Sequence, residues 1–202
     1  RIRVWIAKKI LPKADGVRVV SERIKQSLLK RGLVAERKIT ALPIFTDMSG
    51  IMRAKPNDMR ARYPGKDFFI LMASRLTKEK NISMAIEAMG EIVKKHPRVS
   101  LIIVGEGPEY ENLKFKISNL KLEHHVFLEP YTSDLAGYYK ASDIFLLTSN
   151  YEGYGRVAVE AAAAGIPVVM TDVGVAIGKT VPVGDVTAIA GAIEKLLADT
   201  SG

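Results

Sequence analysis

Short, continuous apolar runs alternate along the chain with helical patterns, and this alternation restricts the fold more than any other feature. The runs are rich in β-branched and aromatic residues, as strands buried on both faces are. They cover residues 17–20, 38–44, 68–73, 100–104, 126–128, 144–147 and 167–170. Helical patterns cover residues 22–31, 81–95, 109–120, 133–141, 157–164 and 186–197. This order predicts right-handed βαβ units, so we expect an α/β protein with a Rossmann-like, doubly wound parallel sheet.

A break in the pattern at residues 50–66 predicts a division of the chain, because Met, Arg, Pro, Asn and Gly replace the regular alternation there. The charge changes at the same place. Residues 1–66 carry 17 basic and 5 acidic side chains, whereas residues 67–202 carry 13 and 17. We therefore predict two units, residues 1–64 and residues 65–202. The first is too short for a complete sheet, and we interpret it as the remnant of a second Rossmann-like domain with its linker.

Composition excludes several classes of protein. The absence of Cys excludes a disulfide framework, a zinc–thiolate site, an iron–sulfur cluster and a thiol nucleophile, and it fits a reducing compartment. No apolar stretch approaches the roughly 20 residues of a membrane span, so we expect a cytoplasmic protein. The basic first unit suits an anionic partner such as a phosphate or a lipid surface, or it is simply a solvated basic face.

Two loops at predicted strand ends carry unusual residues, and in an open parallel sheet ligands bind there. The loop after residues 68–73 holds Arg75 and Lys80 just before a helix. Two cations at a helix start repel the positive end of its dipole, so we expect an anion between them, with a diphosphate as the natural candidate.

The loop after residues 144–147 is the richer of the two. Gly153 and Gly155 allow a close approach of the backbone to a ligand, and the helix that begins near Arg156 directs free amide groups to the same place. Glu160 lies about one turn into that helix among alanines. A carboxylate in such surroundings needs a hydrogen-bonding partner, which is either a neighbouring cation or a ligand.

Glu152 and Glu160 form an E-x7-E pattern in the segment EGYGRVAVEAAAAGIPVVMTDVG, which resembles the signature of the group 1 family of retaining glycosyltransferases of GT-B fold. The segments ASRLTKEKN, IIVGEGPEYENL, VFLEPYTSDLAGYYKASDIFLLTS and VPVGDVTAIAGAIEKLL also follow that family's order. Residues 14–47 are similar to the end of its first domain. The resemblance implies a two-domain enzyme that transfers a sugar from a nucleoside-diphosphate sugar, a UDP or GDP sugar for example, to an acceptor that the sequence does not identify.

The resemblance also implies roles for particular residues. Arg75 and Lys80 would neutralise the diphosphate, Glu160 would bind the ribose hydroxyls, and Glu152 would face the donor sugar. We predict a catalytic role for Glu152, Arg75 and Lys80. The predicted donor-binding residues are Arg75, Lys80, Tyr131, Glu152, Gly153, Tyr154, Gly155, Arg156, Val157 and Glu160. No metal and no cofactor are implied, because fixed cations and amide dipoles stabilise the leaving diphosphate.

The chain departs from the family's pattern in two places. Residues 171–182 are about ten residues shorter than is usual in the family, and most of the first domain is missing. We therefore expect the chain to be a fragment that binds the donor without turning it over.

Other interpretations of the sequence rest on weaker motifs. Gly174, Gly178 and Lys179 with the following Thr make a P-loop pattern that is one residue short, and the glycines after residue 104 lack the rest of a dinucleotide-binding fingerprint. A nucleic acid is not favoured as the partner, because the basic first unit lacks a platform of aromatic side chains on which bases could stack. A non-catalytic nucleotide-binding or membrane-surface module stays open, because basic residues surround apolar ones at the start of the chain: Arg1, Arg3, Lys8 and Lys9 around Ile2, Trp5, Ile6 and Ile10. The same pattern suits a helix packed on a sheet.

Overall fold

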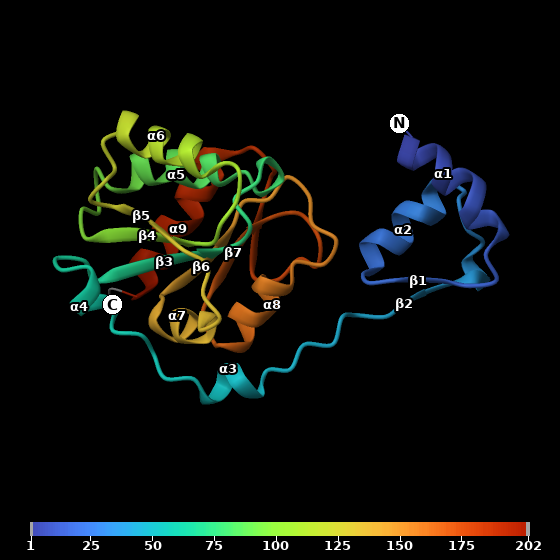
Figure 1. Cartoon of the computed structure of the whole chain (residues 1–202), viewed down its shortest axis with the longest axis horizontal. Coiled ribbons are helices and arrows are strands. Elements are labelled where there is room, and N and C mark those ends of the chain that lie inside the picture. The colour runs from blue at the N-terminus through green and yellow to red at the C-terminus, as the bar shows by residue number, and fades with distance from the viewer. Residues whose placement is uncertain (1, 201–202) are drawn as a thin grey trace.

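The computed structural model describes residues 2–200, with side chains for residues 5–199. A small N-terminal unit and a larger α/β domain are joined by a linker that runs past one face of the larger domain (Figure 1). The predicted α/β fold with a parallel sheet is confirmed.

The N-terminal unit is built from two strands and two longer helices. They are α1 (Ile2–Ile10), β1 (Val17–Val19), α2 (Glu22–Lys30) and β2 (Ile39–Ala41), with the 3-10 turns η1 (Leu11–Lys13) and η2 (Glu36–Lys38). The strands pair in parallel, with Val17 opposite Ile39. The hydroxyl of Ser21 accepts a hydrogen bond from the Ile24 N–H at 3.3 Å, so α2 begins where a capping residue predicts. The apolar core of this unit is small: Val19, Leu33, Val34 and Ile39.

The linker contains two short helices, α3 (Ser49–Arg53) and α4 (Met59–Arg62), where the sequence predicted irregular structure. The carboxylate of Asp58 accepts a hydrogen bond from the Ala61 N–H at 3.0 Å and so caps α4. Met59 and Tyr63 are buried in the core of the larger domain.

The larger domain has a six-stranded parallel sheet in the order β5-β4-β3-β6-β7-β8. The strands are β3 (Phe68–Ala73), β4 (Val99–Val104), β5 (Val126–Glu129), β6 (Ile144–Leu147), β7 (Val168–Thr171) and β8 (Lys179–Val181). The first five match predicted apolar runs to within a residue or two. The edge strand β8 was missed, because only three residues pair with β7 and they form no apolar run.

Helices cover both faces of this sheet, as a doubly wound domain requires (Figure 1). The helices are α5 (Ile82–Ile92), α6 (Tyr110–Asn119), α7 (Leu135–Ala141), α8 (Arg156–Ala163) and α9 (Val186–Thr200), with the 3-10 turn η3 (Lys78–Lys80) before α5. Side chains of α5, α6 and α9 form one apolar core with the sheet. Those of α4, α7 and α8 form the core on the other face.

The loops at the carboxyl ends of the strands are fastened to one another. Ser74 donates its N–H to the Val104 carbonyl at 3.1 Å, and Leu76 donates to Glu106 at 2.8 Å. A Cβ on Gly105 or Gly107 would collide with the backbone of Ser74 or Leu76. The two glycines of this turn therefore serve close packing between the loops after β3 and β4.

Candidate functional site

A cleft of about 700 Å³ opens at the carboxyl ends of β3, β4 and β5. The loops after these strands form part of its lining, with α7, the start of α8 and the linker. Five of the residues singled out from the sequence line it: Arg75, Tyr131, Arg156, Val157 and Glu160. The cleft lies where ligands bind in open parallel sheets, outside the carboxyl ends of the strands.

Glu160 is held in the cleft by two partners. Its side chain is only 12% exposed. The Arg156 Nε donates to one carboxylate oxygen at 2.9 Å, and the Tyr139 hydroxyl donates to the other at 3.1 Å. The sequence left a neighbouring cation or a ligand as the partner of Glu160, and the structure shows such a cation in Arg156, one helical turn earlier. Each carboxylate oxygen keeps further acceptor capacity, since an ionised carboxylate has about four lone-pair sites.

Tyr139 is a site residue that sequence reasoning missed. It is 1% exposed, and its ring packs edge-on against Phe145. Burial, and then the nearby Glu160 carboxylate, raise the pKa of the Tyr139 phenol well above its ordinary value. The hydroxyl therefore stays protonated and remains a hydrogen-bond donor to Glu160. No sequence signal marks it, because a Tyr in an amphipathic helix predicts only a core position.

Lys80 and Glu152 pair with each other, and neither is part of the cleft lining. The Lys80 Nζ is 2.6 Å from Glu152 Oε1, and the Ser149 hydroxyl donates to the same oxygen at 2.7 Å. The two charged side chains are 16% and 11% exposed. The structure thus joins two predicted site residues that are 72 positions apart in the sequence.

The start of α8 follows the glycine-rich segment, as predicted. Gly155 precedes the helix with φ of 86°, a backbone conformation that favours glycine. The Tyr154 carbonyl accepts a hydrogen bond from the Val175 N–H at 2.9 Å. A Cβ on Gly174 would lie 2.7 Å from the Tyr154 oxygen and 2.9 Å from the Glu152 Cβ. The short segment after β7 therefore packs directly on the predicted sugar-binding loop.

The predicted cations differ in their freedom. Arg75 is 79% exposed, and its guanidinium lies 3.9 Å from the Glu79 carboxylate. Arg156 is 65% exposed despite its contact with Glu160. Two exposed guanidinium groups thus border the cleft, whereas the Lys80 ammonium is largely buried and paired with Glu152.

The linker supplies the part of the lining that the sequence did not indicate. Asp47, Gly50 and Ile51 line the cleft together with the loops of the larger domain. The hydroxyl-bearing residues Thr132 and Ser133, in the loop after β5, also line the cleft. The composition of the linker predicted irregular structure, so nothing in the sequence indicated that linker residues would lie at a site.

The P-loop alternative fails on local structure. Lys179 and Thr180 lie in strand β8, whereas a P-loop needs its Lys and Ser/Thr at the start of a helix. Within residues 5–199, no three His, Cys, Asp or Glu side chains are grouped so that they could hold a metal ion. None of the helices described here has both the length and the apolar character needed to cross a bilayer.

Comparison with known proteins identifies the family. Residues 56–201 match the family described as glycosyl transferases group 1. A capsular polysaccharide biosynthesis glycosyltransferase, CapM of Staphylococcus aureus, is 32% identical over 93% of this chain and 53% of its own length. The chain spans about half or less of the length of three curated relatives that it matches: 53%, 16% and 39%.

Solved structures agree with this match. Sucrose-phosphate synthase from Thermosynechococcus elongatus aligns with a TM-score of 0.84 and 29% identity, over 99% of this chain and 53% of that one. HepE of Anabaena, solved in complex with UDP, aligns with a TM-score of 0.84 and 25% identity, over 99% of this chain and 58% of its own. With its parallel sheet and strand-end cleft, the chain belongs to the group 1 family of glycosyltransferases.

Proposed function

We propose that the cleft binds a nucleoside-diphosphate sugar and that the protein transfers the sugar to an acceptor with retention of anomeric configuration and without a metal ion. The observation that carries this proposal is the arrangement of charge in the cleft. The Glu160 carboxylate, which is 12% exposed, lies one turn into α8, and the exposed guanidinium groups of Arg75 and Arg156 border the same space. Hydroxyls and a diphosphate are the ligand groups that suit these partners.

The diphosphate would bind between Arg75 and the start of α8. Negative charge accumulates on the leaving diphosphate as the glycosidic bond breaks, so cations and backbone N–H groups fixed there favour the transition state over the ground state. Arg75 and Lys80 carry this role in the proposal, with the Gly153–Val157 backbone beside them. Arg156 adds a third cation. Neutralisation by these groups is our reason for proposing that no divalent cation takes part.

Glu160 and Glu152 would recognise hydroxyl groups. Glu160 is fixed by Tyr139 and Arg156, so its remaining lone pairs are available to ribose hydroxyls. Glu152 is held by Lys80 and Ser149 beside the cleft, where we place the donor sugar. Tyr131 is 71% exposed in the cleft wall and is our candidate for contact with the base.

Relatives support a UDP sugar as the donor. Structures of HepE contain UDP and UDP-glucose. CapM acts in capsular polysaccharide biosynthesis, and another relative is an alpha-monoglucosyldiacylglycerol synthase of Streptococcus pneumoniae. Transfer of the sugar to an acceptor, and catalytic turnover by a whole protein as long as these relatives, are part of the same proposal.

Calorimetry tests donor binding directly. We expect one of UDP, GDP and ADP to bind in the presence of EDTA. Glu160→Ala should weaken that binding by roughly 1.5–3 kcal/mol, the range for a hydrogen bond to a charged group. Glu194→Ala is the matched control, because Glu194 pairs with Lys95 away from the cleft and should leave the affinity unchanged. Equal affinities for Glu160→Ala and the unaltered chain would remove Glu160 from the site.

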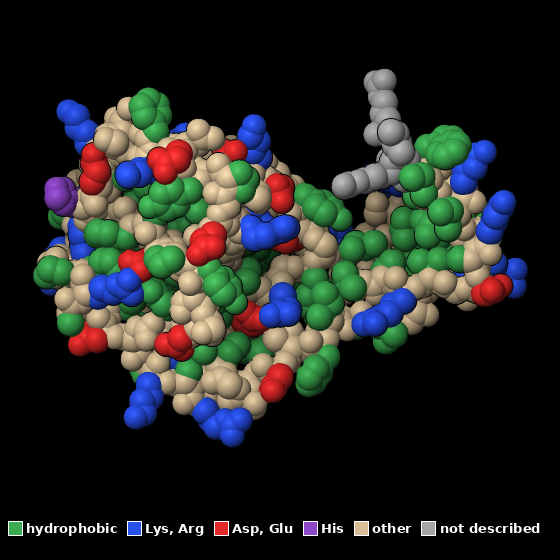
Figure 2. Space-filling view, viewed as in Figure 1, with side chains coloured by type: hydrophobic (Ala, Val, Ile, Leu, Met, Phe, Trp, Pro, Cys, Tyr) green, Lys and Arg blue, Asp and Glu red, His purple; other side chains and the backbone are tan. Residues whose placement is uncertain are grey.

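We further propose peripheral contact of the N-terminal unit with an anionic membrane. Trp5 and Ile10 of α1 are 60% and 59% exposed, and the ammonium of Lys9 lies 4.9 Å from the centre of the Trp5 ring. Figure 2 shows Lys and Arg side chains interspersed with hydrophobic ones over this unit. Basic and apolar groups together favour the surface of an anionic bilayer. Flotation with vesicles that contain or lack anionic lipid tests this contact, and equal recovery with both would refute it.

A further inference from the structure

The cleft has a wall that belongs neither to the N-terminal unit nor to the strand-end loops. This wall is formed by residues 45–57 of the linker, which we call the linker strap. Its members Asp47, Gly50 and Ile51 line the cleft. In Figure 1, helix α3 of the strap lies directly beneath α7 and α8.

The strap is attached to the larger domain at two points. Helix α3 contacts both α7 and α8, and the Ile51 side chain is 9% exposed there. Farther along, Asn57 donates its N–H to the Gly137 carbonyl of α7 at 3.1 Å. A Cβ on Gly137 would lie 2.6 Å from the Asn57 Oδ1, so the backbone of α7 comes close to the strap at this point.

Other parts of the strap are only lightly held. Phe45 is 88% exposed and Met52 is 70% exposed. The chain just before the strap is attached to the N-terminal unit, where Leu42 donates its N–H to Val19 at 2.8 Å. Ile51 is the one buried residue within α3, so this helix buries little apolar surface for a segment that lines the cleft.

We infer that the linker strap is part of the donor site and that its docking and nucleotide binding stabilise each other. This inference rests on the proposed function, because it takes the ligand of the cleft to be a nucleoside diphosphate. A ligand that touches Gly50 and Ile51 buries more surface when α3 is seated than when it is detached. By linkage, docking must strengthen binding by the same factor by which the ligand strengthens docking.

Asp47 adds a polar element to the strap. Its carboxylate accepts a hydrogen bond from the Ser49 N–H at 2.9 Å, and backbone hydrogen bonding of this kind holds the pKa of Asp47 below its ordinary value. An ionised carboxylate in the cleft wall offers an acceptor to the hydroxyls or the base N–H of a nucleotide. The strap would therefore contribute a hydrogen-bond acceptor for the nucleotide as well as a wall of the cleft.

Two pairs of substitutions test the strap, and each pair has its control at Met52, which is exposed and does not line the cleft. Ile51→Ala removes the buried side chain, whereas Met52→Ala alters an exposed one. Gly50→Phe adds a ring at a residue of the cleft lining, where a Cβ meets no atom within 4 Å, whereas Met52→Phe adds the same ring at an exposed residue outside the lining. UDP affinity is measured by calorimetry, and hydrogen exchange of residues 45–57 is measured with and without UDP.

We expect Ile51→Ala to weaken UDP binding roughly 3- to 30-fold, a change equivalent to about 0.6–2 kcal/mol. Gly50→Phe should reduce binding further, and both controls should bind as the unaltered chain does. UDP should slow exchange in α3 of the unaltered chain. Melting temperatures of the larger domain should agree among the four variants, because none of them touches its cores.

The outcomes separate the strap from the proposed function. If the unaltered chain binds UDP, while Ile51→Ala and Gly50→Phe bind it equally well and exchange in α3 does not respond, the strap inference is overturned and the proposed function stands. If the unaltered chain binds no nucleoside diphosphate, the proposed function fails and the strap inference fails with it.

Discussion

The N-terminal unit and the larger domain both consist of parallel strands and helices, but they differ in how much apolar surface they bury. The larger domain has a six-stranded sheet covered on both faces, with two extended apolar cores. The N-terminal unit has a two-stranded sheet and, from residue 5 onward where its side chains are described, a core of four buried residues. Two strands with so small a core are marginal on their own, because stability grows with the area removed from water.

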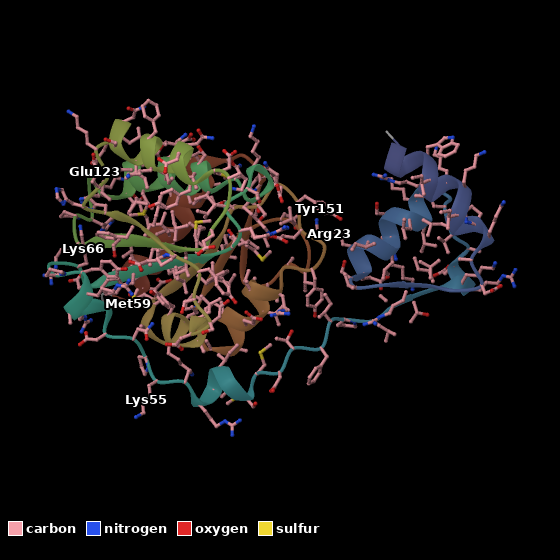
Figure 3. All side chains as sticks on the ribbon, viewed as in Figure 1. Arg23, Lys55, Met59, Lys66, Glu123 and Tyr151 are labelled. Carbon is pink, nitrogen blue, oxygen red and sulfur yellow. The ribbon has the colours of Figure 1, made fainter. Side chains whose placement is uncertain are left out.

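The larger domain therefore holds both the candidate site and most of the buried apolar surface that stabilises the protein. Most of the cleft lining lies on the larger domain, whose sheet holds the strand ends, the loops after them and helices α7 and α8 around the cleft. The N-terminal unit is connected to the larger domain by the linker and by Arg23, which extends from α2 toward the loop after β7 (Figure 3). We therefore expect the two regions to unfold separately.

A matched pair of core substitutions should give the largest effect. Ile103 in β4 is fully buried and Ile39 in β2 is 5% exposed. Ile103→Ala should lower the free energy of unfolding of the larger domain by about 2–5 kcal/mol, because a large-to-small change leaves a cavity. Ile39→Ala should move only the transition of the N-terminal unit. Far-UV circular dichroism follows the larger domain, and fluorescence of Trp5, the single Trp, follows the N-terminal unit.

Coincident transitions by both probes, in the unaltered chain and in both variants, would contradict this comparison. They would mean that one cooperative unit spans the linker.

The second prediction concerns where the larger domain begins. The Tyr63 hydroxyl donates to Glu129 Oε1 at 2.6 Å, and Arg62 forms an ion pair with the same carboxylate. Tyr63 is 6% exposed, and burial, followed by the hydrogen bond to Glu129, raises its pKa well above the ordinary value. Tyr63→Phe should therefore destabilise the larger domain by about 1.5–3 kcal/mol, the range for a hydrogen bond to a charged group.

The control for this change is Tyr131→Phe, because Tyr131 is 71% exposed and should not alter the melting temperature. If Tyr63→Phe is equally silent, the hydrogen bond between Tyr63 and Glu129 at the end of α4 does not stabilise the larger domain. Chemical denaturation of the two variants in parallel decides between these results.

Sequence reasoning succeeded where the physical signal is local and strong. Continuous apolar runs located β3 to β7, and the glycines before Arg156 located the start of α8. It failed where the signal is spread over distant residues. Strand β8 exists because β7 offers it an edge, and α3 exists in a segment that carries no helical period. Asp58 before α4 is a capping signal that could have been used.

The same distinction holds for the site. Arg75 is a cation shortly before a helix, and Glu160 is a carboxylate among alanines. Both charges are unusual at such positions, so the sequence alone identifies them as candidate site residues. Tyr139 and Ile51 are apolar or aromatic residues in helices, and only the packing of α7 and α3 around the cleft reveals their positions. The contact between Lys80 and Glu152 follows from the fold and from no pattern in the chain.

The third prediction uses pH to act on the larger domain alone. His125 is half-buried, and its Nδ1 lies 2.8 Å from the Lys66 Nζ. Burial, together with the positive charges of Lys66 and His124, lowers the pKa of His125 below its ordinary value of 6.5. The unfolded chain then binds a proton before the folded one does as the pH falls. The free energy of unfolding should therefore decrease as the pH drops below about 6.5 and level off below the folded pKa.

His125→Gln should flatten this part of the pH profile, whereas His124→Gln, at an exposed position, should leave most of it. Urea denaturation between pH 5 and pH 8 measures both profiles. An unchanged slope in His125→Gln would assign the pH dependence to other groups, and the Trp5 transition should not follow this slope in any variant.

The smallest effect is expected at the ion pair between the two regions. The Arg23 Nη1 donates to the Asp172 carbonyl at 3.0 Å, and the guanidinium also pairs with the Asp172 carboxylate. The side chains are 46% and 55% exposed, so their coupling should be at most about 1 kcal/mol and should vanish in high salt. A double-mutant cycle of Arg23→Ala and Asp172→Ala measures it. A coupling of about 2 kcal/mol or more that persists in salt would show that the small unit shares the stability of the large one. A weak, salt-sensitive coupling leaves the linker as the connection that sets where the N-terminal unit lies.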